Sequence, residues 1–199
     1  HKLHWLRSNI EINFLKKQLE EILGKKFLLD KNIFKKAKGM HIHDDPDTAV
    51  FKYNLNFILD YYELDLATSE LIKSYVKSEK EFCKRYFLSI EEINEISKLG
   101  HIIAWHTEKH IPMSKLSKTD IKKDLDFGYE FLNSINSLEE KHLCYPYGRI
   151  DALPLKNLDD VLYSKFKYGW TLDNVNKEYS QTPYNKVLLQ RITTNELFK

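Results

Sequence analysis

Apolar residues recur along this chain with two spacings, and each spacing predicts one kind of element. Helical spacing predicts helices over residues 9–23, 48–62, 89–99, 117–135 and 157–165. Short apolar runs predict strands near residues 39–43, 64–68, 100–105, 142–145, 166–172 and 187–192. Because the two kinds alternate, the pattern favours a parallel α/β sheet of about six strands. Six strands are too few for a regular barrel of about eight, so we expect an incomplete or distorted barrel or an open sheet.

Several predicted helices carry signals for their ends. Gly24 follows the first helix at the position where a left-handed residue usually stops one. Ser89 is followed three residues later by Glu92, which is the pattern of a capping box, and Gly100 stops that helix. These signals fix the boundaries of the elements that precede the first candidate site.

The apolar run at residues 100–105 leads directly into His106 and His110. The carboxyl ends of strands are where α/β folds place their chemistry, because the loops there converge on one crevice. Two imidazoles on one short loop supply half of a metal site. The alternative is a pair of surface histidines without a common partner, and the H-x-x-x-H pattern alone specifies metal weakly.

The predicted strand at 39–43 runs directly into Asp44 and Asp45, with Asp47 shortly after them. Adjacent carboxylates repel one another unless a cation or hydrogen bonds compensate. Acidic residues also favour helix N-termini, so capping of the following helix is the alternative explanation. We assign the capping role to Asp47 and favour function for Asp44 and Asp45.

A third strand end, at residues 142–145, enters Pro146, Tyr147 and Gly148. Proline and glycine around a tyrosine form a rigid turn, which can hold a backbone N–H in a fixed direction. Taken alone, this short sequence is more typical of an ordinary turn than of a site.

Composition narrows the class of protein. The 31 basic and 29 acidic residues are interleaved and leave a net charge of +2, so we expect no nucleic-acid partner. Cys83 and Cys144 are too far apart to suggest a disulfide framework or a cysteine-rich zinc site. No run of about 18 apolar residues is present, so we expect no membrane span.

We expect one domain over residues 1–199, in which residues 1–38 form a helical lead-in. The chain begins at His1 without a signal-peptide pattern, so its ends do not identify a compartment. We favour a cytoplasmic location slightly over an exported or cell-surface one. The abundance of tyrosine and lysine and the scarcity of glycine are compatible with a bacterial source.

Taken together, the three strand ends resemble the motifs of the polysaccharide deacetylase family, also called NodB homology domains or carbohydrate esterase family 4. The resemblance covers about residues 10–195. The first motif is matched by His43-Asp44-Asp45. The second, H-[ST]-x-x-H, is matched by His106-Thr107-Glu108-Lys109-His110, and the third by Tyr145-Pro146-Tyr147-Gly148. Three motifs in the family's order are far more specific than any one of them.

The resemblance implies a distorted or incomplete (β/α) barrel of NodB type and a metal-dependent N-deacetylase. Its substrate would be an N-acetylated amino sugar in a polysaccharide or glycan. Asp45, His106 and His110 would bind the metal, most simply zinc, with cobalt, nickel or manganese as alternatives. Asp44 would be the general base. Thr107 would support the loop geometry without binding the metal.

Two further residues take substrate roles by the same resemblance. The Tyr147 backbone N–H would stabilise the oxyanion. Trp170 would form an aromatic wall against the acetyl group or the sugar, although a tryptophan of the core is an equally good interpretation.

The sequence also departs from the family pattern. Pro46 replaces the usual glycine after the aspartates, and Cys144 stands where an arginine often braces the base. Leu189-Gln190-Arg191 replaces the leucine, any residue and histidine of the last motif, and no histidine follows His142. The general acid must therefore come from another loop, from a water or from residues beyond Lys199, and His41 and His43 are candidates by their place in the sequence. Two alternatives follow: a deacetylase-like domain that binds glycan or metal with weak or no turnover, or a deacylase for another acyl group on a lipid- or nucleotide-linked sugar.

Overall fold

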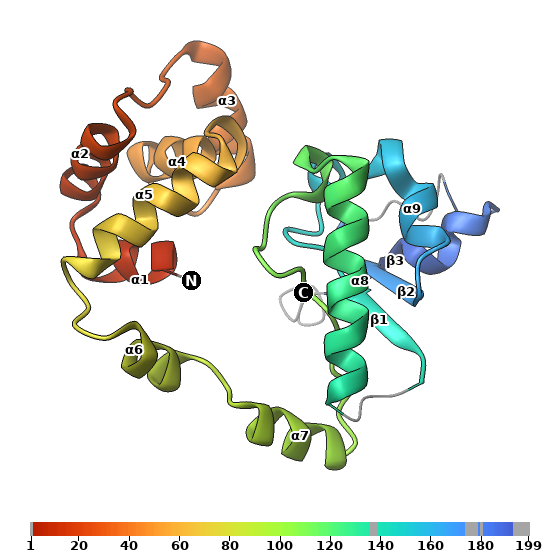
Figure 1. The fold of residues 1–199 in the computed structure, drawn as a ribbon. Coiled ribbons are helices and arrows are strands. Elements are labelled where there is room, and N and C mark those ends of the chain that lie inside the picture. Colours follow the sequence, from red (N-terminus) through yellow and green to blue (C-terminus); the bar gives the residue numbers. More distant parts are fainter. Residues whose placement is uncertain (1, 136–138, 174–178, 180, 193–199) are drawn as a thin grey trace. The chain divides into compact units, whose positions relative to one another are not determined.

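The structure is a computed structural model that describes residues 2–135, 139–173, 179 and 181–192. Its contacts divide the chain into two compact units, residues 1–87 and residues 88–199, which are shown in Figure 1. Each unit has a core of its own and is described by itself. The expectation of one domain over residues 1–199 stays a prediction.

The regular elements in the described residues of the N-terminal unit are all helices. Its elements are α1 (Lys2–Asn9), α2 (Ile12–Leu23), α3 (Lys31–Met40), α4 (Pro46–Tyr53), the π-helix η1 (Asn54–Ile58), α5 (Tyr61–Lys73) and α6 (Glu79–Tyr86). Helix α2 ends as predicted at Gly24, whose φ of 65° is left-handed. The predicted helix over 48–62 is confirmed as far as Ile58, in the form of α4 followed by η1.

Two strands predicted in this unit are wrong. Residues 64–68 lie inside α5, where Leu64, Ala67 and Leu71 are buried with helical spacing. Residues 39–43 span the end of α3 and a turn, and Ile42 is 72% exposed. Short apolar runs do not distinguish a strand from a helix, and here the helical face that reaches a core decides the outcome.

The C-terminal unit contains a three-stranded parallel sheet in the order β1–β2–β3. The strands are β1 (Lys141–Cys144), β2 (Phe166–Thr171) and β3 (Leu189–Gln190). The strands predicted near 142–145 and 166–172 are confirmed, and the last strand is shorter than predicted. The α/β class is therefore confirmed for this unit, but its described strands do not close a barrel.

The run at 100–105 does not form the strand that its apolar residues predict. Only Trp105 pairs with the sheet, through a single parallel bridge to Leu143. Ile102 is 53% exposed, so this run lacks the cover on both faces that a buried parallel strand requires. The described residues thus contain three strands and one bridge where about six strands were expected.

The helices of this unit are, in sequence order, α7 (Ile90–Lys98), α8 (Lys118–Ser134) and α9 (Leu158–Leu162). The capping box is confirmed, because the Ser89 side chain accepts from the Glu92 N–H and the Glu92 carboxylate accepts from the Ser89 N–H. Short 3-10 turns complete the unit: η2 (Met113–Lys115), η3 (Ile150–Ala152), η4 (Leu155–Asn157) and η5 (Pro183–Val187).

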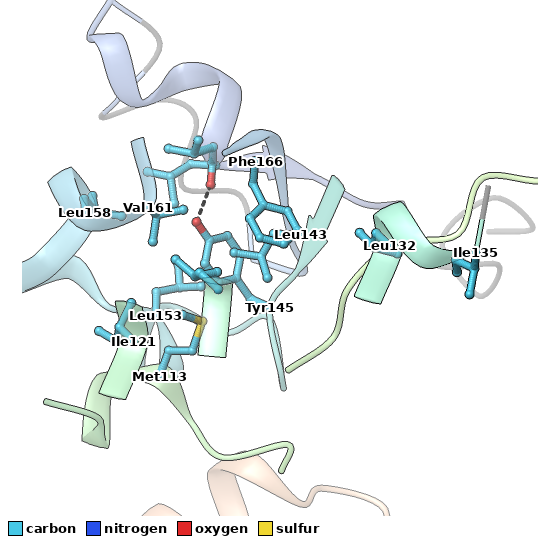
Figure 2. Close-up of a cluster of buried hydrophobic side chains, with 13 residues drawn as sticks. Met113, Ile121, Leu132, Ile135, Leu143, Tyr145, Leu153, Leu158, Val161 and Phe166 are labelled. Carbon is cyan, nitrogen blue, oxygen red and sulfur yellow. Dashed lines mark hydrogen bonds between the residues drawn. The ribbon is translucent and has the colours of Figure 1, made fainter. Parts of the chain in front are cut away.

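A hydrophobic cluster at the end of β1 fixes the position of the turn that follows this strand (Figure 2). Tyr145 is fully buried there, and its hydroxyl donates to the Val187 carbonyl at 2.7 Å. Burial raises the pKa of Tyr145 far above its ordinary value, so the phenol stays a neutral donor. Gly169 leaves room for this bond, since a Cβ at that position would lie 2.4 Å from the same carbonyl oxygen. The turn at Pro146–Gly148 therefore starts from a fixed point.

Candidate functional site

His106 and His110 lie close together in the C-terminal unit, as the sequence predicts. Their ring centroids are 4.8 Å apart, with an angle of 77° between the planes. His106 Nδ1 lies 2.6 Å from the Cys144 carbonyl oxygen at the end of β1. A carbonyl only accepts, so Nδ1 carries the hydrogen, and in the neutral ring Nε2 keeps its lone pair. This is the usual arrangement of a metal-binding histidine, whose second nitrogen is fixed by a backbone or carboxylate acceptor.

The backbone around the histidines is in an uncommon conformation. Thr107, His110 and Tyr147 have φ values of 62°, 54° and 63°, and they are the non-glycine residues with positive φ in the described part of the chain. The His110 N–H donates to Thr107 Oγ1 at 3.1 Å, which supports the loop as expected for Thr107. Non-glycine residues with left-handed φ values persist only where their surroundings impose this conformation, and they cluster at functional sites.

The predicted rigid turn brings Tyr147 to the histidine loop. The Tyr147 and His110 ring centroids are 4.9 Å apart. Gly148 has a φ of 62°, and a Cβ there would lie 2.6 Å from the Leu172 nitrogen and 2.8 Å from an Arg191 guanidinium nitrogen. The structure thus brings His106, His110 and Tyr147 together, with Arg191 beside the turn.

Trp170 lies on β2 and is only partly buried. Its ring stacks on His142 at 5.9 Å between centroids, and its Nε1–H donates to His142 Nδ1 at 3.0 Å. Burial lowers the pKa of His142 below its ordinary value, which keeps the imidazole neutral and able to accept this bond. Trp170 is not part of the buried core cluster, and its role as a substrate wall stays a prediction.

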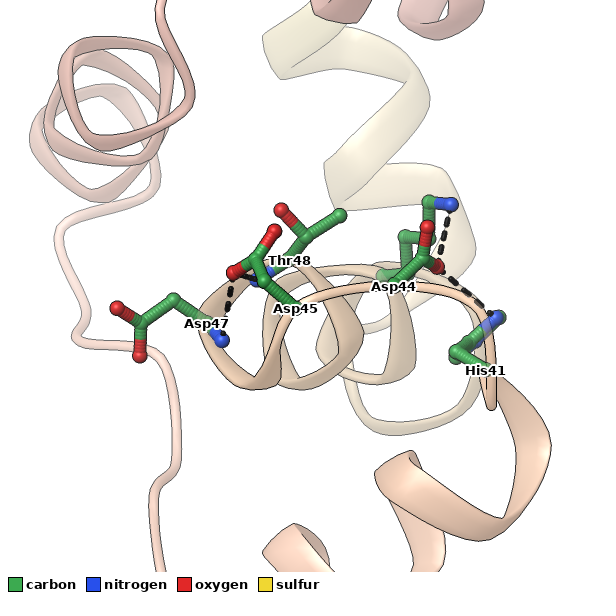
Figure 3. A network of polar contacts seen from close by, with 6 residues as sticks. His41, Asp44, Asp45, Asp47 and Thr48 are labelled. Carbon is green, nitrogen blue, oxygen red and sulfur yellow. Dashed lines mark hydrogen bonds and ion pairs between the residues drawn. The ribbon is translucent and has the colours of Figure 1, made fainter.

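In the N-terminal unit, Asp45 is the N-cap of α4 (Figure 3). Its Oδ1 accepts from the backbone N–H groups of Asp47 at 3.1 Å and Thr48 at 3.0 Å. The assignment of the cap to Asp47 is therefore wrong, because Asp45 sits at the residue before the first helical one, where a carboxylate reaches these two donors. Hydrogen bonds from the side chain and backbone of Thr48, and then from the backbone of Asp47, hold the pKa of Asp45 below its ordinary value.

Asp44 has different partners from its neighbour. Its Oδ2 forms an ion pair with Lys52 Nζ, from α4, and lies 3.7 Å from His41 Nδ1 (Figure 3). Both Asp44 and Lys52 are about four-fifths buried, at 23% and 19% side-chain exposure. The ion pair turns the Asp44 carboxylate toward α4, where the ammonium competes with any other partner for it.

The predicted site residues are distributed over both units. Asp44 and Asp45 belong to the N-terminal unit, whereas His106, His110 and Tyr147 belong to the C-terminal one. In neither unit do the described residues include three His, Cys, Asp or Glu side chains grouped as a metal site. The donor types nevertheless suit a borderline divalent cation, with two imidazoles, one of them oriented through Cys144, and an ionised carboxylate. The triad stays a prediction.

Sequence reasoning missed two groups that contact the histidine loop. One is the Cys144 carbonyl, because a backbone acceptor carries no residue signature. The other is Asp124 of α8, whose carboxylate accepts from the Trp105 indole N–H at 2.7 Å and from the Glu108 backbone N–H at 3.0 Å. An acidic residue on an amphipathic helix is indistinguishable in sequence from an ordinary solvated one.

Among the residues that the structure describes, no helix combines the length and apolar composition needed to span a bilayer.

Comparison with known proteins completes the description of the site. Residues 44–164 match the polysaccharide deacetylase family. The chain is similar to poly-β-1,6-N-acetyl-D-glucosamine N-deacetylases of Staphylococcus aureus strains MSSA476, MRSA252 and N315. The identity is 28% over 186 residues, which cover 86% of this chain and 58% of each relative. The chain thus spans less than two thirds of the length of these relatives. No solved structure matches it.

Proposed function

This chain belongs to the polysaccharide deacetylase family, and we propose that it removes acetyl groups from N-acetylated amino sugars in a sugar polymer with the help of a divalent metal ion. The observation that carries the proposal is the strained loop that holds His106 and His110 ring to ring beside Tyr147. The names of the staphylococcal relatives make a polymer of N-acetylglucosamine the first substrate to test.

We propose further that both units belong to one deacetylase. The family match runs from residue 44 to residue 164 and so crosses the boundary between the units at residues 87 and 88. It includes Asp44, Asp45, both histidines of the loop and Tyr147.

Asp45, His106 and His110 would hold the metal ion, with zinc as the first choice. When bound, the ion supplies Lewis-acid chemistry at the acetamide carbonyl. The Cys144 carbonyl keeps the Nδ1 hydrogen of His106 in place, so that Nε2 is the nitrogen presented to a cation. The low pKa of Asp45 keeps its carboxylate charged at neutral pH, as a ligand requires.

Asp44 would accept a proton from the water that attacks the acetamide carbon. The Tyr147 N–H would donate to the oxygen that becomes negative in the tetrahedral intermediate. Collapse of this intermediate breaks the C–N bond, and the leaving nitrogen must gain a proton. A guanidinium group does not release a proton in proteins, so an arginine cannot supply it. Within the proposed set of residues, the proton that Asp44 has taken from the water can pass to the nitrogen. One carboxyl group can act first as the base and then as the acid.

One observation favours the alternative of a binding domain with weak turnover. Asp44 forms an ion pair with Lys52, and this ammonium competes with an attacking water for the same carboxylate oxygen. General acid or base help is worth about 10²–10⁴-fold in rate, so this pairing would slow turnover without preventing binding.

Acetate release separates the two functions. The purified chain would be supplied with zinc or cobalt and incubated with oligomers of β-1,6-linked N-acetylglucosamine. Asp44→Asn removes the proposed base, and Asp47→Asn is the matched control, because Asp47 is an exposed neighbour whose carboxylate points away from the cap in Figure 3. Release that Asp44→Asn removes and Asp47→Asn retains supports the enzyme. Metal binding without release from this or other acylated amino-sugar polymers supports the binding domain.

A further inference from the structure

Trp105, the residue before His106, is joined to β1 through its backbone. Its N–H donates to the His142 carbonyl at 2.9 Å, and its carbonyl accepts from the Cys144 N–H at 2.7 Å. The chain therefore enters the histidine loop from a fixed point on the edge of the sheet. This bridge fixes the start of the loop and leaves residues 107–110 to be held by other contacts.

The Trp105 side chain lies against one face of α8. Gly128 makes this contact close, because a Cβ at that position would lie 2.5 Å from atoms of the indole. Phe127 and Phe131 flank the indole, with ring centroids 5.7 Å and 5.8 Å away. The indole N–H donates to Asp124 Oδ1, one helical turn before Gly128. Helix α8 thus supplies both a slot and an acceptor for this tryptophan.

The second oxygen of Asp124 reaches the loop itself. Asp124 Oδ2 accepts from the backbone N–H of Glu108 at 3.0 Å, and Glu108 lies between His106 and His110. One carboxylate thereby contacts the chain on both sides of His106. Hydrogen bonds to a carboxylate are stronger than those between neutral groups. This pair of bonds is therefore well suited to hold the loop backbone in a conformation that it does not favour by itself.

The loop needs such a contact because Thr107 and His110 both have left-handed φ values. A non-glycine residue with a left-handed φ value persists only where its surroundings impose that conformation. We propose that Asp124 is a positioning residue, which holds the Trp105–Glu108 segment on α8 and so keeps the His106 and His110 rings paired for a divalent cation. The inference rests on the proposed function for the identity of the ligand.

The test compares Asp124→Ala and Asp124→Asn with Asp126→Ala in the full chain. Asp126 is an exposed carboxylate on the same helix, so its removal makes the same change in charge. Cobalt(II) is titrated into each protein, and the visible absorption of the bound ion reports its ligand geometry. We expect both Asp124 variants to bind cobalt about 10- to 100-fold more weakly with an altered spectrum, the usual range for outer contacts of metal ligands. Asp126→Ala should match the unsubstituted chain.

A second measurement uses the metal-free proteins. Proton NMR records the contact between the His106 and His110 rings and the exchange of the Glu108 amide hydrogen. In the Asp124 variants we expect the ring contact to be lost and the Glu108 amide to exchange faster. If Asp124→Ala does not fold, Trp105→Phe keeps an aromatic ring in the slot but removes the indole donor, and it should show a smaller loss of the same kind.

The outcomes separate the inference from the proposed function. Unchanged cobalt affinity and spectrum in folded Asp124→Ala would overturn the positioning role while leaving the metal site in place. Failure of the unsubstituted chain to bind cobalt would overturn the proposed metal site. In that case the NMR measurement decides the positioning role alone: a ring contact that survives in Asp124→Ala refutes it, and one that disappears supports it.

Discussion

Asp45 makes its hydrogen bonds two and three residues away, whereas the groups that hold the histidine loop lie 16 and 38 residues away. The segment with Asp45 is therefore satisfied by its own helix. The loop with His106 and His110 contains two left-handed residues and depends on Asp124 and the Cys144 carbonyl. One half of the motif residues is thus held by local contacts, whereas the conformation of the other half depends on contacts from distant parts of the chain.

Removal of a loop histidine should have the largest effect. His110→Ala deletes one of the two imidazoles, so we expect metal affinity to fall by more than about 100-fold, beyond the range of outer contacts. Zinc affinity measured by competition with a chelating dye tests this. His101→Ala is the matched control, because His101 is exposed on the same run of chain and outside the ring pair. An equal loss in both variants would contradict the assignment.

Two glycine-to-alanine changes compare the helices of the two units. Alanine is favoured over glycine inside a helix by about 0.5–1 kcal/mol. In α3, Gly39 has no atom within 4 Å of an added Cβ, so Gly39→Ala should be stabilising. In α8, Gly128→Ala would drive a methyl group into the Trp105 indole, and overpacking costs about 1–3 kcal/mol.

Urea unfolding of both glycine variants measures this contrast. We expect Gly128→Ala to be destabilised by about 1–2 kcal/mol after the gain in helix propensity is subtracted. Its zinc affinity should fall as well, because the displaced indole is the side chain of Trp105, the residue next to His106. Stabilisation of both variants would show that α8 can shift away from Trp105 without cost, and would weaken the description of the slot.

Substitutions of Asp45 separate its capping role from its proposed role as a ligand. Asparagine caps helices about as well as aspartate, so Asp45→Asn should leave thermal stability nearly unchanged. Asp45→Ala should lower the unfolding midpoint by about 2–4 °C, because the cap is lost. Both should weaken zinc binding if Asp45 is a ligand. Zinc affinity that survives in Asp45→Asn would leave this carboxylate as a cap alone.

The same contrast explains how much of the molecule the sequence could predict. Local signals succeeded, as with the Ser89–Glu92 capping box and the stop at Gly24. The strands at 39–43 and 64–68 failed, because a short apolar run becomes a strand only when a distant strand pairs with it. At the site, the closeness of His106 and His110 followed from four residues of separation. The contacts from Asp124 and Cys144 carry no motif and arise only when distant segments meet.

The smallest expected effect concerns His142 and its stacked partner Trp170. Burial lowers the pKa of His142 in the folded chain, so the unfolded chain binds this proton more readily. The stabilising contribution is complete above the ordinary pKa of 6.5 and is lost as the pH falls through the lower folded value. Protonation would also remove the acceptor of the Trp170 indole N–H. We therefore expect the thermal unfolding midpoint to decrease as the pH is lowered from about 7 to about 5. The midpoint of His142→Gln should decrease less over the same range. Calorimetry at several pH values checks this, and an identical pH dependence in both proteins would show that other groups cause the loss.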